Sequence, residues 1–457
     1  MPGLSTQFWA FSAAVQRKKV SLVNVCIASF LVLWLARVQD VSLFQQPSTA
    51  RPSGPASHNL VDLSHAASPF IGWPLARVCS ETTWVPGLVF ICDNNSGGIG
   101  NIRNYILTCV RYAIEAGATG LVVPRIRTRS ASDLADIMRD YRPFNYFFDE
   151  GHFRKSLAES CPRIVVYDAT EDIPHAPSPF RAERLTPNEL GLRAGCDQRD
   201  LNRHADIFGF RFRSWLQDTA RQFDLPLTSM QAPRVIRLNW GVQWDYPVYQ
   251  DGPEFAATFG GILRFRSDIL QLGEKIASHV KRLAVPGSRE HGRLGFAGIH
   301  LRTESDALVR WPNFEEQSTA YLEKIARIGL KTAYLATGNS TEASKLAETA
   351  LRDHGIRVVT KHSILEDHQL EIASITALTW DQQALVDFFV LLESNFFLGV
   401  SPSSFSMNVA LKRHLKADGL YTRPWKVGGE SDGYSWLVGH YDSYWEDWLF
   451  MFQSLWP

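Results

Sequence analysis

Four polar side chains occupy every second position near the end of an apolar run, GIHLRTESD at residues 298–306. If the run forms a continuous strand, its two-residue alternation places all four on one side: His300, Arg302, Glu304 and Asp306. A guanidinium can bind two oxygens at once, which suits it to a diphosphate. The pattern predicts one wall of an anion-binding cleft, and a salt-bridge network between domains is the structural alternative.

A second segment places hydroxyl groups where a helix begins. The strand-like run FFLGV leads into SPSSFS, residues 401–406, which opens a helical segment. The first N–H groups of a helix have no partner within it, and together with the helix dipole they attract anions. Ser403, Ser404 and Ser406 are therefore candidate phosphate ligands. Serines at such a position also commonly cap a helix without binding any ligand.

The third segment is rich in glycine, NSGGIGNIRN at residues 95–104, and lies between an apolar run and a helical pattern. Glycines allow a ligand to approach the backbone closely, and the following helix offers N–H groups to an anion. The candidates for ligand binding here are Gly97, Gly98, Gly100 and Asn101. The segment is neither a GxGxxG motif nor a P-loop, so a tight turn without a ligand is the alternative.

The elements around these motifs alternate between short apolar runs and helical patterns. From Gly87 to residue 124 the order is strand, loop, helix and strand, which is typical of a βαβ unit. A second alternation begins near Ser267. We expect two doubly wound, Rossmann-like α/β domains, at 86–288 and 289–457. The three motifs would then meet in the cleft at the carboxyl ends of the strands.

The composition is that of a folded globular protein, with 45% hydrophobic and 21% charged residues. Its 457 residues exceed what one hydrophobic core usually serves, which agrees with two domains. The 47 basic residues balance 47 acidic ones, so the formal net charge is zero. Because no overall field attracts nucleic acid, we expect no nucleic-acid partner, and phosphate recognition must come from local groups.

An apolar run without charges, Val20 to Ala36, follows three basic residues near the N-terminus. Its length is the lower limit for a membrane helix, and the basic cluster favours a cytosolic N-terminus. We expect a cytosolic tail at 1–19, a transmembrane anchor at 20–38 and a flexible stem, rich in Ser and Pro, at 39–85. This predicts a single-pass type II protein of the Golgi or ER membrane. A cleaved signal peptide is the alternative, although no AxA-like site follows the run.

Five of the six cysteines lie beyond the apolar run, and none forms a CxxC pair: Cys79, Cys92, Cys109, Cys161 and Cys196. An odd number allows at most two disulfides and one free thiol, with the pairing left open. Zinc is not indicated, and no DxD segment offers ligands to a divalent metal. We therefore expect no metal site.

Three segments, in their order along the chain, resemble the O-fucosyltransferase superfamily. HLRTESD is similar to its HLRxExD or HLRxGxD element, and DFFVLLESNFFLGVSPSSFSMNVALKR is similar to its C-terminal element with an SSFS-type turn. NSGGIGNIRNYILTCVRYAIEAGATGLVVP resembles its opening loop and helix. The stretch YPVYQDGPEFAATFGGILRFRSDILQLGE is also similar to the peptide O-fucosyltransferases. Order and spacing agree over roughly residues 87–415.

This resemblance implies a GT-B architecture with two domains facing a cleft, an inverting mechanism, and GDP-fucose as the donor without a metal or other cofactor. A hydroxyl of a protein or a glycan would be the acceptor. Carried over to this sequence, the resemblance assigns the β-phosphate to Arg302. It assigns phosphate and nucleoside contacts to Ser403, Ser404 and Phe405.

The resemblance also places Asn101 opposite the diphosphate and the reacting centre. His300 and Asp306 would line the nucleotide pocket or position Arg302. Glycines 97, 98 and 100 would form the loop that faces the donor. The expected catalytic residues are thus Arg302, Asn101 and Glu304.

The general base for the acceptor hydroxyl is less well defined. Some relatives place a glutamate in the glycine loop, where this chain has Gly97, Gly98 and Ile99. Either another carboxylate, such as Glu304, serves as the base, or the reaction is dissociative enough to need none. Asp387 matches an aspartate of the family's C-terminal element, and a purely structural role is equally open for it.

Two other functions fit the same motifs. Because the phosphate motifs do not read the sugar or the base, the chain could transfer another deoxysugar, such as rhamnose. It could also be a lumenal protein that binds a nucleotide sugar or a glycan without turnover. The aromatic C-terminal segment at 443–456 is expected to pack into the core as a helix.

Overall fold

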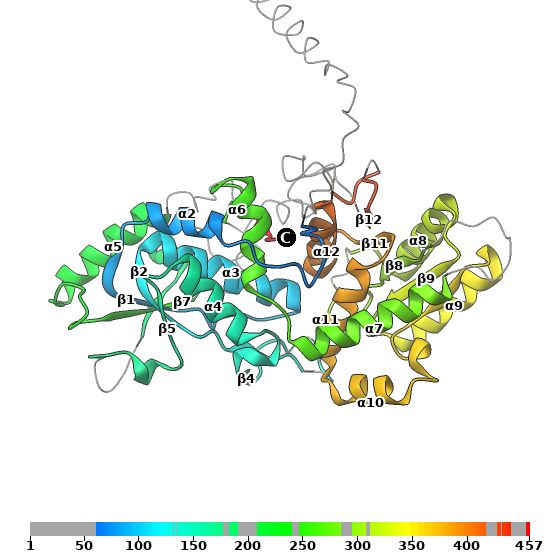
Figure 1. Cartoon of the computed structure of the whole chain (residues 1–457), viewed down its shortest axis with the longest axis horizontal. Helices are drawn as coiled ribbons and strands as arrows, with labels where there is room; N and C mark the ends of the chain where they lie inside the picture. The colour runs from blue at the N-terminus through cyan, green and yellow to red at the C-terminus, as the bar shows by residue number, and fades with distance from the viewer. Residues whose placement is uncertain are drawn as a thin grey trace, which may run out of the picture. The chain divides into compact units, whose positions relative to one another are not determined.

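A computed structural model describes residues 61–130, 132–134, 136–176, 182–190, 208–239, 246–284, 295–307, 311–416, 427–430, 432–439 and 454–457, to which all structural statements refer. Within them the chain forms an α/β fold around two five-stranded sheets (Figure 1). Every strand pair in both sheets is parallel. Parallel strands need crossover connections, which helices usually supply. The expected α/β fold with parallel sheets is confirmed.

The first sheet has the strand order β5-β2-β1-β7-β6. Its central strand, β1 (Val85–Ile91), is buried over its last five residues, as expected for a strand covered on both faces. The other strands are β2 (Ala118–Val122), β5 (Val165–Tyr167), β6 (Glu183–Leu185) and β7 (Arg234–Leu238). A separate antiparallel pair, β3 (Ile126–Arg127) and β4 (Tyr141–Arg142), lies just after β2 in the chain.

The second sheet has the order β10-β9-β8-β11-β12. Its three inner strands are buried throughout: β8 (Ala297–His300), β9 (Thr332–Ala336) and β11 (Phe396–Val400). The edge strands β10 (Arg357–Val359) and β12 (Ser435–Val438) are partly exposed. The inner strands coincide with the apolar runs from which the sequence predicted strands, because a strand buried on both faces needs apolar side chains on both.

Helices connect the strands of both sheets. Those before the second sheet are α2 (Trp73–Glu81), α3 (Ile99–Ala116), α4 (Glu150–Ser160), α5 (Phe208–Gln222), α6 (Pro253–Thr258) and α7 (Ser267–Leu283). Those of the second sheet are α8 (Phe314–Ile328), α9 (Ser340–His354), α10 (Gln369–Ala377), α11 (Trp380–Leu392) and α12 (Ser404–His414). Short 3₁₀ helices include η1 (Phe144–Tyr146), η2 (Thr170–Asp172), η3 (Pro187–Leu190), η5 (Phe259–Ile262) and η6 (Ser363–Leu365).

Helix α7 precedes the second sheet in sequence but packs against a helix of that sheet. A Cβ on Gly273 would lie 2.7 Å from the Phe389 ring in α11, so the two helices approach closely. Lys281 of α7 also pairs with Glu393 at 2.6 Å. Helix α7, the last helix of the predicted domain 86–288, therefore contacts the second half, and the boundary itself stays a prediction.

The predicted flexible stem is wrong over its last part. Helix α2 lies within residues 39–85, and its Leu75, Val78 and Cys79 side chains are buried. A Ser- and Pro-rich composition indicates a spacer only where apolar side chains are sparse. The segment WPLARVCSE, in contrast, has apolar side chains at helical spacing.

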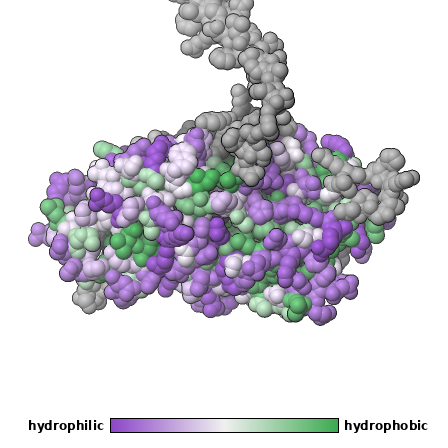
Figure 2. Space-filling model, in the orientation of Figure 1, coloured by the Kyte–Doolittle hydropathy of each residue, from purple (hydrophilic) through white to green (hydrophobic). Residues whose placement is uncertain are grey.

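Residues 20–38, predicted as a transmembrane anchor, lie outside the described ranges, as does the rest of the chain before residue 61. None of the described helices is long and apolar enough to cross a membrane. On the face shown in Figure 2, hydrophilic residues predominate and apolar residues form small separate groups.

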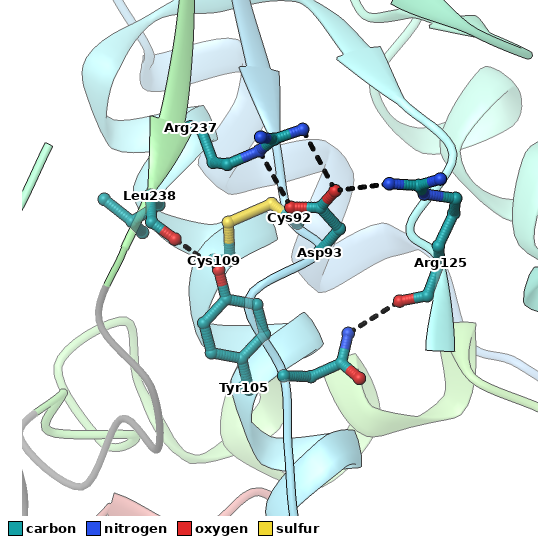
Figure 3. The surroundings of a disulfide bond; sticks show 8 residues. Cys92, Asp93, Tyr105, Cys109, Arg125, Arg237 and Leu238 are labelled. Atoms are coloured by element: carbon teal, nitrogen blue, oxygen red, sulfur yellow. Dashed lines mark hydrogen bonds and ion pairs between the residues drawn. A yellow bond between two sulfur atoms is a disulfide. The ribbon is translucent and has the colours of Figure 1, made fainter. Parts of the chain in front are cut away.

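Two disulfides join elements of the first half, a pairing that the sequence left open. Cys79 of α2 pairs with Cys161, which follows α4. Cys92, directly after β1, pairs with Cys109 in α3, as Figure 3 shows. Cys196 and Cys26 lie outside the described residues.

Candidate functional site

A cavity of about 780 Å³ lies between the end of β8 and the first turns of α3 and α11. Its walls come from both halves of the fold. The lining includes several residues that the sequence analysis singled out: Gly97, Gly98, His300, Arg302, Glu304, Asp387 and Phe405. It also includes residues that the sequence analysis did not single out: Arg129, Phe147, Gly338, Lys361, Trp380 and Asp381.

The Arg302 guanidinium lies in this cavity and is held by two carboxylates. Its Nη1 pairs with Glu304 at 2.6 Å and its Nη2 with Asp306 at 2.7 Å. Burial by itself would lower the pKa of Arg302, but these two carboxylates raise it above its ordinary value. The side-chain amide of Gln317 binds both the N–H and the C=O of Arg302 at 3.0 Å, which fixes the backbone.

The way in which these residues converge differs from the sequence prediction. Strand β8 ends at His300, so strand alternation does not extend to Glu304 and Asp306. The chain instead turns after the strand, and this turn allows both carboxylates to form ion pairs with Arg302. The residues were grouped correctly from the sequence, although a turn and not a continuous strand brings them together.

The Glu304 carboxylate is almost fully buried and has two partners. One oxygen accepts from Arg302 and the other accepts the Gly338 N–H at 2.7 Å. Burial by itself would raise the pKa of Glu304, but Arg302, His300 and the Gly338 N–H lower it below its ordinary value. A general base works best with a pKa near the working pH, so this carboxylate is better suited to hold Arg302 than to accept a proton.

A second guanidinium reaches the same cluster from the first half. Arg129 Nη2 pairs with Asp306 at 2.7 Å, and the Arg129 side chain is only 12% exposed. Its Nε is buried and makes no hydrogen bond with any residue that the structure describes. The sequence analysis missed Arg129, and the only local signal was the density of arginines in RIRTR, residues 125–129.

His300 closes the inner end of the cavity beside Phe405. Its Nδ1 lies 2.7 Å from Ser406 Oγ, and its ring centroid is 4.5 Å from that of Phe405. Burial lowers the pKa of His300 to about 4, so the ring is neutral at pH 7. The Ser406 hydroxyl also accepts the Val400 N–H, which links β11 to the start of α12.

The serines at the start of α12 have different roles. Ser403 is the N-cap and accepts the Ser406 N–H, and Ser406 binds His300, so both act within the protein. The N–H groups of Ser404 and Phe405 donate no hydrogen bond to a described residue. Ser404 itself packs against the other half, because a Cβ on Gly100 would lie 2.8 Å from its Oγ.

The glycine-rich loop and the start of α3 face α12 at this point. Gly97 has φ 85°, a conformation that favours glycine, and a Cβ there would lie 2.8 Å from Asn101 Nδ2. Gly98 is exposed in the cavity and has no neighbour within 4 Å of a Cβ. Asn101 Oδ1 is buried without a hydrogen-bond partner among the described residues. Gly100 therefore allows α3 and α12 to pack closely, while Gly97 and Gly98 shape the cavity.

The opposite wall carries an aromatic ring and a buried charge pair. Trp380 begins α11 beside Asp381, whose Oδ1 accepts from the Tyr146 hydroxyl at 2.8 Å. Asp387, one of the residues matched by resemblance, accepts from Lys361 at 2.7 Å and from a tyrosine hydroxyl at 2.6 Å. This wall combines an indole ring with carboxylate and ammonium groups.

The carboxyl edge of the first sheet carries a second charged cluster, shown in Figure 3. Asp93, buried directly after β1, pairs with Arg237 at 3.1 Å and with Arg125 at 3.5 Å. These arginines are 32% and 54% exposed, so they are far more open to water than Arg129 and Arg302. The sequence analysis did not identify this cluster.

The described end of the chain also packs against the first half. Trp456 is fully buried, stacks on Tyr246 with centroids 5.6 Å apart, and donates its indole N–H to Thr108. The other aromatic residues of the 443–456 segment lie outside the described residues. In the described ranges, no group of three or more His, Cys, Asp or Glu side chains is arranged to hold a metal.

Among solved structures, the chain matches POFUT1 in complex with GDP, at 15% identity, a TM-score of 0.44, and coverage of 79% of this chain and 100% of that one. POFUT1 in complex with GDP-fucose has 15% identity, a TM-score of 0.47, and coverage of 78% and 99%. The fucosyltransferase NodZ from Bradyrhizobium has 14% identity, a TM-score of 0.37, and coverage of 72% and 92%.

A comparison with curated protein sequences found no match. The model of the GDP-fucose protein O-fucosyltransferase family matches residues 88–416, which include all three motifs and well over half of the chain. A match of this extent covers both sheets as far as β11 and places Arg302 and the glycine-rich loop within the family's region. The chain is therefore a glycosyltransferase that belongs to the GDP-fucose protein O-fucosyltransferase family.

Proposed function

We propose that the chain transfers fucose from GDP-fucose to a hydroxyl group of a protein or glycan, with inversion and without a metal. One observation carries this proposal: the doubly held Arg302 guanidinium lies in a cavity onto which the first turns of α3 and α12 open. A diphosphate needs fixed positive groups on one side of a cleft, and this arrangement supplies them.

The proposed diphosphate site combines a side chain with backbone groups. Arg302 uses two of its N–H groups on carboxylates, which leaves three of the five donors of a guanidinium for phosphate oxygens. The free N–H groups of Ser404 and Phe405 add the positive end of α12. We assign the β-phosphate to Arg302 on this basis, and Gly98 leaves space for the ligand against the start of α3.

The nucleoside is proposed to lie along the wall formed by Trp380, Lys361 and Asp387. The indole offers a face for stacking, and the carboxylate can accept N–H groups of a base. His300 and Phe405 close the pocket behind the base or ribose. Because His300 is neutral at pH 7, it binds by hydrogen bonding and packing and adds no charge.

The proposed chemistry is a displacement at the anomeric carbon of fucose. The acceptor oxygen forms a bond to this carbon, the bond to the β-phosphate oxygen breaks, and its electron pair leaves with GDP. The acceptor proton is released, so the products are a fucoside, GDP and a proton. Arg302 stabilises the charge that develops on the leaving phosphate, and Glu304 and Asp306 position Arg302. Asn101 stays a candidate for the reacting centre.

The proposed location is the lumen of the Golgi or ER, with residues 20–38 as a type II anchor. The two disulfides support an oxidising compartment, because disulfides are rare in cytosolic proteins. The apolar run itself and the basic residues before it support the anchor.

Calorimetric titration of the purified full-length chain with GDP, GDP-fucose and UDP in EDTA tests the proposal. We expect micromolar binding of both guanine nucleotides without added metal, and loss of this binding in Arg302→Ala. The matched control is Arg352→Ala, because Arg352 is 68% exposed on α9 and, among the described residues, pairs only with its neighbour Asp353.

The alternatives give different titrations. Heat with UDP and none with GDP would move the donor to another nucleotide sugar. Binding of GDP-fucose without hydrolysis or transfer, under conditions in which many acceptors are offered, would favour a binding protein. No heat with any of the three nucleotides would contradict the proposed donor site.

A further inference from the structure

A second cavity, of about 600 Å³, lies behind the donor cavity, and its lining includes Arg103 of the glycine-rich segment and Lys412 of the C-terminal motif. It is enclosed by the chain segment before α2, by the α6–η5 region, and by side chains of α3, α11 and α12. We call it the rear cavity. Phe388 lines the rear cavity and contacts Phe405, which lines the donor cavity, with ring centroids 5.5 Å apart. The two cavities thus share a wall.

The charges that line the rear cavity have one sign. Arg103, Arg264 and Lys412 all line it, and none of its lining residues is Asp or Glu. The remaining lining is largely apolar and includes Phe265 and Phe388. Buried or half-buried charges are normally paired, so a cavity with several cations and no acid is an unusual surface.

Two of these cations have no hydrogen bond or ion pair among the residues that the structure describes. Lys412 is half-buried on α12, and its ammonium makes no hydrogen bond or ion pair with another described residue. Arg264 follows η5, and its guanidinium likewise has no partner within the described part of the chain. Arg103 differs, because its Nη1 and Nη2 donate to the C=O groups of Trp456 and Pro457 at 2.5 and 2.6 Å.

The pKa of Lys412 is low for a lysine, although the nearby Asp62 raises it in part. Burial, and then the nearby Arg103, lower the pKa of Lys412 to about 7. A lysine that serves only as a solvated surface charge keeps its ordinary pKa of about 10.4. An anion bound beside Lys412 would oppose both effects and favour the charged form.

We propose that the rear cavity binds a small organic anion, whose phosphate or carboxylate group pairs with Lys412 and Arg264. The apolar part of such a ligand would pack against Phe265 and Phe388, which line the same cavity. This site is distinct from the donor cavity, so its occupancy does not depend on the proposed function.

The test is calorimetric titration of the full-length chain with hexyl phosphate, hexanoate and inorganic phosphate at pH 6.5. We expect hexyl phosphate or hexanoate to bind more tightly than inorganic phosphate, because only the organic anions use the apolar wall. The first two probes distinguish a phosphate from a carboxylate ligand. In Lys412→Met the affinity should fall by about tenfold or more, as expected for loss of a charge-assisted hydrogen bond.

Lys416→Met is the matched control, because Lys416 follows Lys412 by four residues but is exposed and approaches Asp62 at 3.9 Å. Binding should persist in this variant and in Arg302→Ala, and should weaken in Arg264→Gln. Melting curves of the ligand-free variants establish that each is folded. If Lys412→Met does not fold, Arg264→Gln still provides the test.

Three results would overturn the proposal. The first is that the wild-type chain binds none of the three probes. The second is that Lys412→Met and Arg264→Gln both bind the probes as tightly as the wild type does. The third is loss of probe binding in Arg302→Ala with retention in Lys412→Met, which would place the anion in the donor cavity.

Discussion

Each half of the molecule carries an aspartate between two arginines, and the arginines of the two clusters differ in their exposure to water. Asp93 pairs with Arg125 and Arg237 at 3.5 and 3.1 Å, and all three belong to the first half. Asp306 pairs with Arg302 and Arg129 at 2.7 Å each, and Arg129 comes from the other half. The first cluster closes within one half, whereas the second connects the two.

This difference indicates which cluster can act on a ligand. Arg125 is 54% exposed, so water and salt screen its charge strongly. Arg302 and Arg129 are 15% and 12% exposed and line a cavity, where charges interact more strongly with a bound anion. The same residue types thus form a cluster with exposed arginines in one half and a candidate catalytic site in the other.

The largest expected effect is on turnover in Arg302→Ala. Removal of this guanidinium should lower the rate of GDP release from GDP-fucose by about 100- to 1000-fold, because a preorganised donor to the developing charge is lost. GDP formation is measured with and without candidate acceptors. Arg237→Ala, the counterpart in the first cluster, should retain most of the activity, and equal losses in both variants would remove the distinction between the clusters.

The second prediction concerns His300, the neutral neighbour of the Arg302 cluster. Its folded pKa of about 4 lies below the ordinary value of 6.5, so between these pH values the unfolded chain binds more protons. The contribution to stability is complete above pH 6.5 and is lost as the pH falls towards 4, by up to about 3 kcal/mol. Urea unfolding at pH 7.5 and pH 4.5 measures this loss.

The control for this experiment is His300→Gln, which keeps a polar group near Ser406 but does not titrate. Its free energy of unfolding should depend less steeply on pH than that of the wild type. If the free energy of unfolding has the same slope with pH in both proteins, burial does not hold His300 neutral. Water would then reach this wall of the cavity, as it reaches the first cluster.

A smaller effect is expected from Arg129→Ala, which removes the pair between the halves. Loss of one partner of buried Asp306 should raise the KM for GDP-fucose by about tenfold, or ~1.4 kcal/mol, with a smaller change in kcat. Initial rates over a range of donor concentrations measure both constants. Arg129→Lys should recover part of the loss, and a change in kcat alone would argue against a role in donor binding.

The smallest effect is expected from Arg125→Ala in the first cluster. Arg125 is 54% exposed and lies 3.5 Å from Asp93, so this pair should contribute only about 1 kcal/mol, and Arg237 still pairs with Asp93 after the change. Urea unfolding and donor KM should both stay close to wild-type values. A donor KM that rises as much as in Arg129→Ala would show that the first cluster also contacts the ligand.

Local sequence patterns predicted the elements well and the site in part. The strands β8, β9 and β11 and the helix α7 lie where apolar periodicity placed them, because their burial depends on local pattern. The polar residues after β8 were grouped correctly, although the strand ends at His300. The predicted stem extended too far, because it was inferred from composition and not from the apolar spacing in α2.

The sequence by itself determined the order of elements, the family motifs and the identity of Arg302 as the leading cation, since each depends on residues close in the chain. Only the tertiary structure decided that Arg129 pairs with Asp306, that Gly100 packs on Ser404, and that Cys79 pairs with Cys161. These contacts join residues far apart in the sequence. They depend on how two packed halves meet, and no local propensity encodes that geometry.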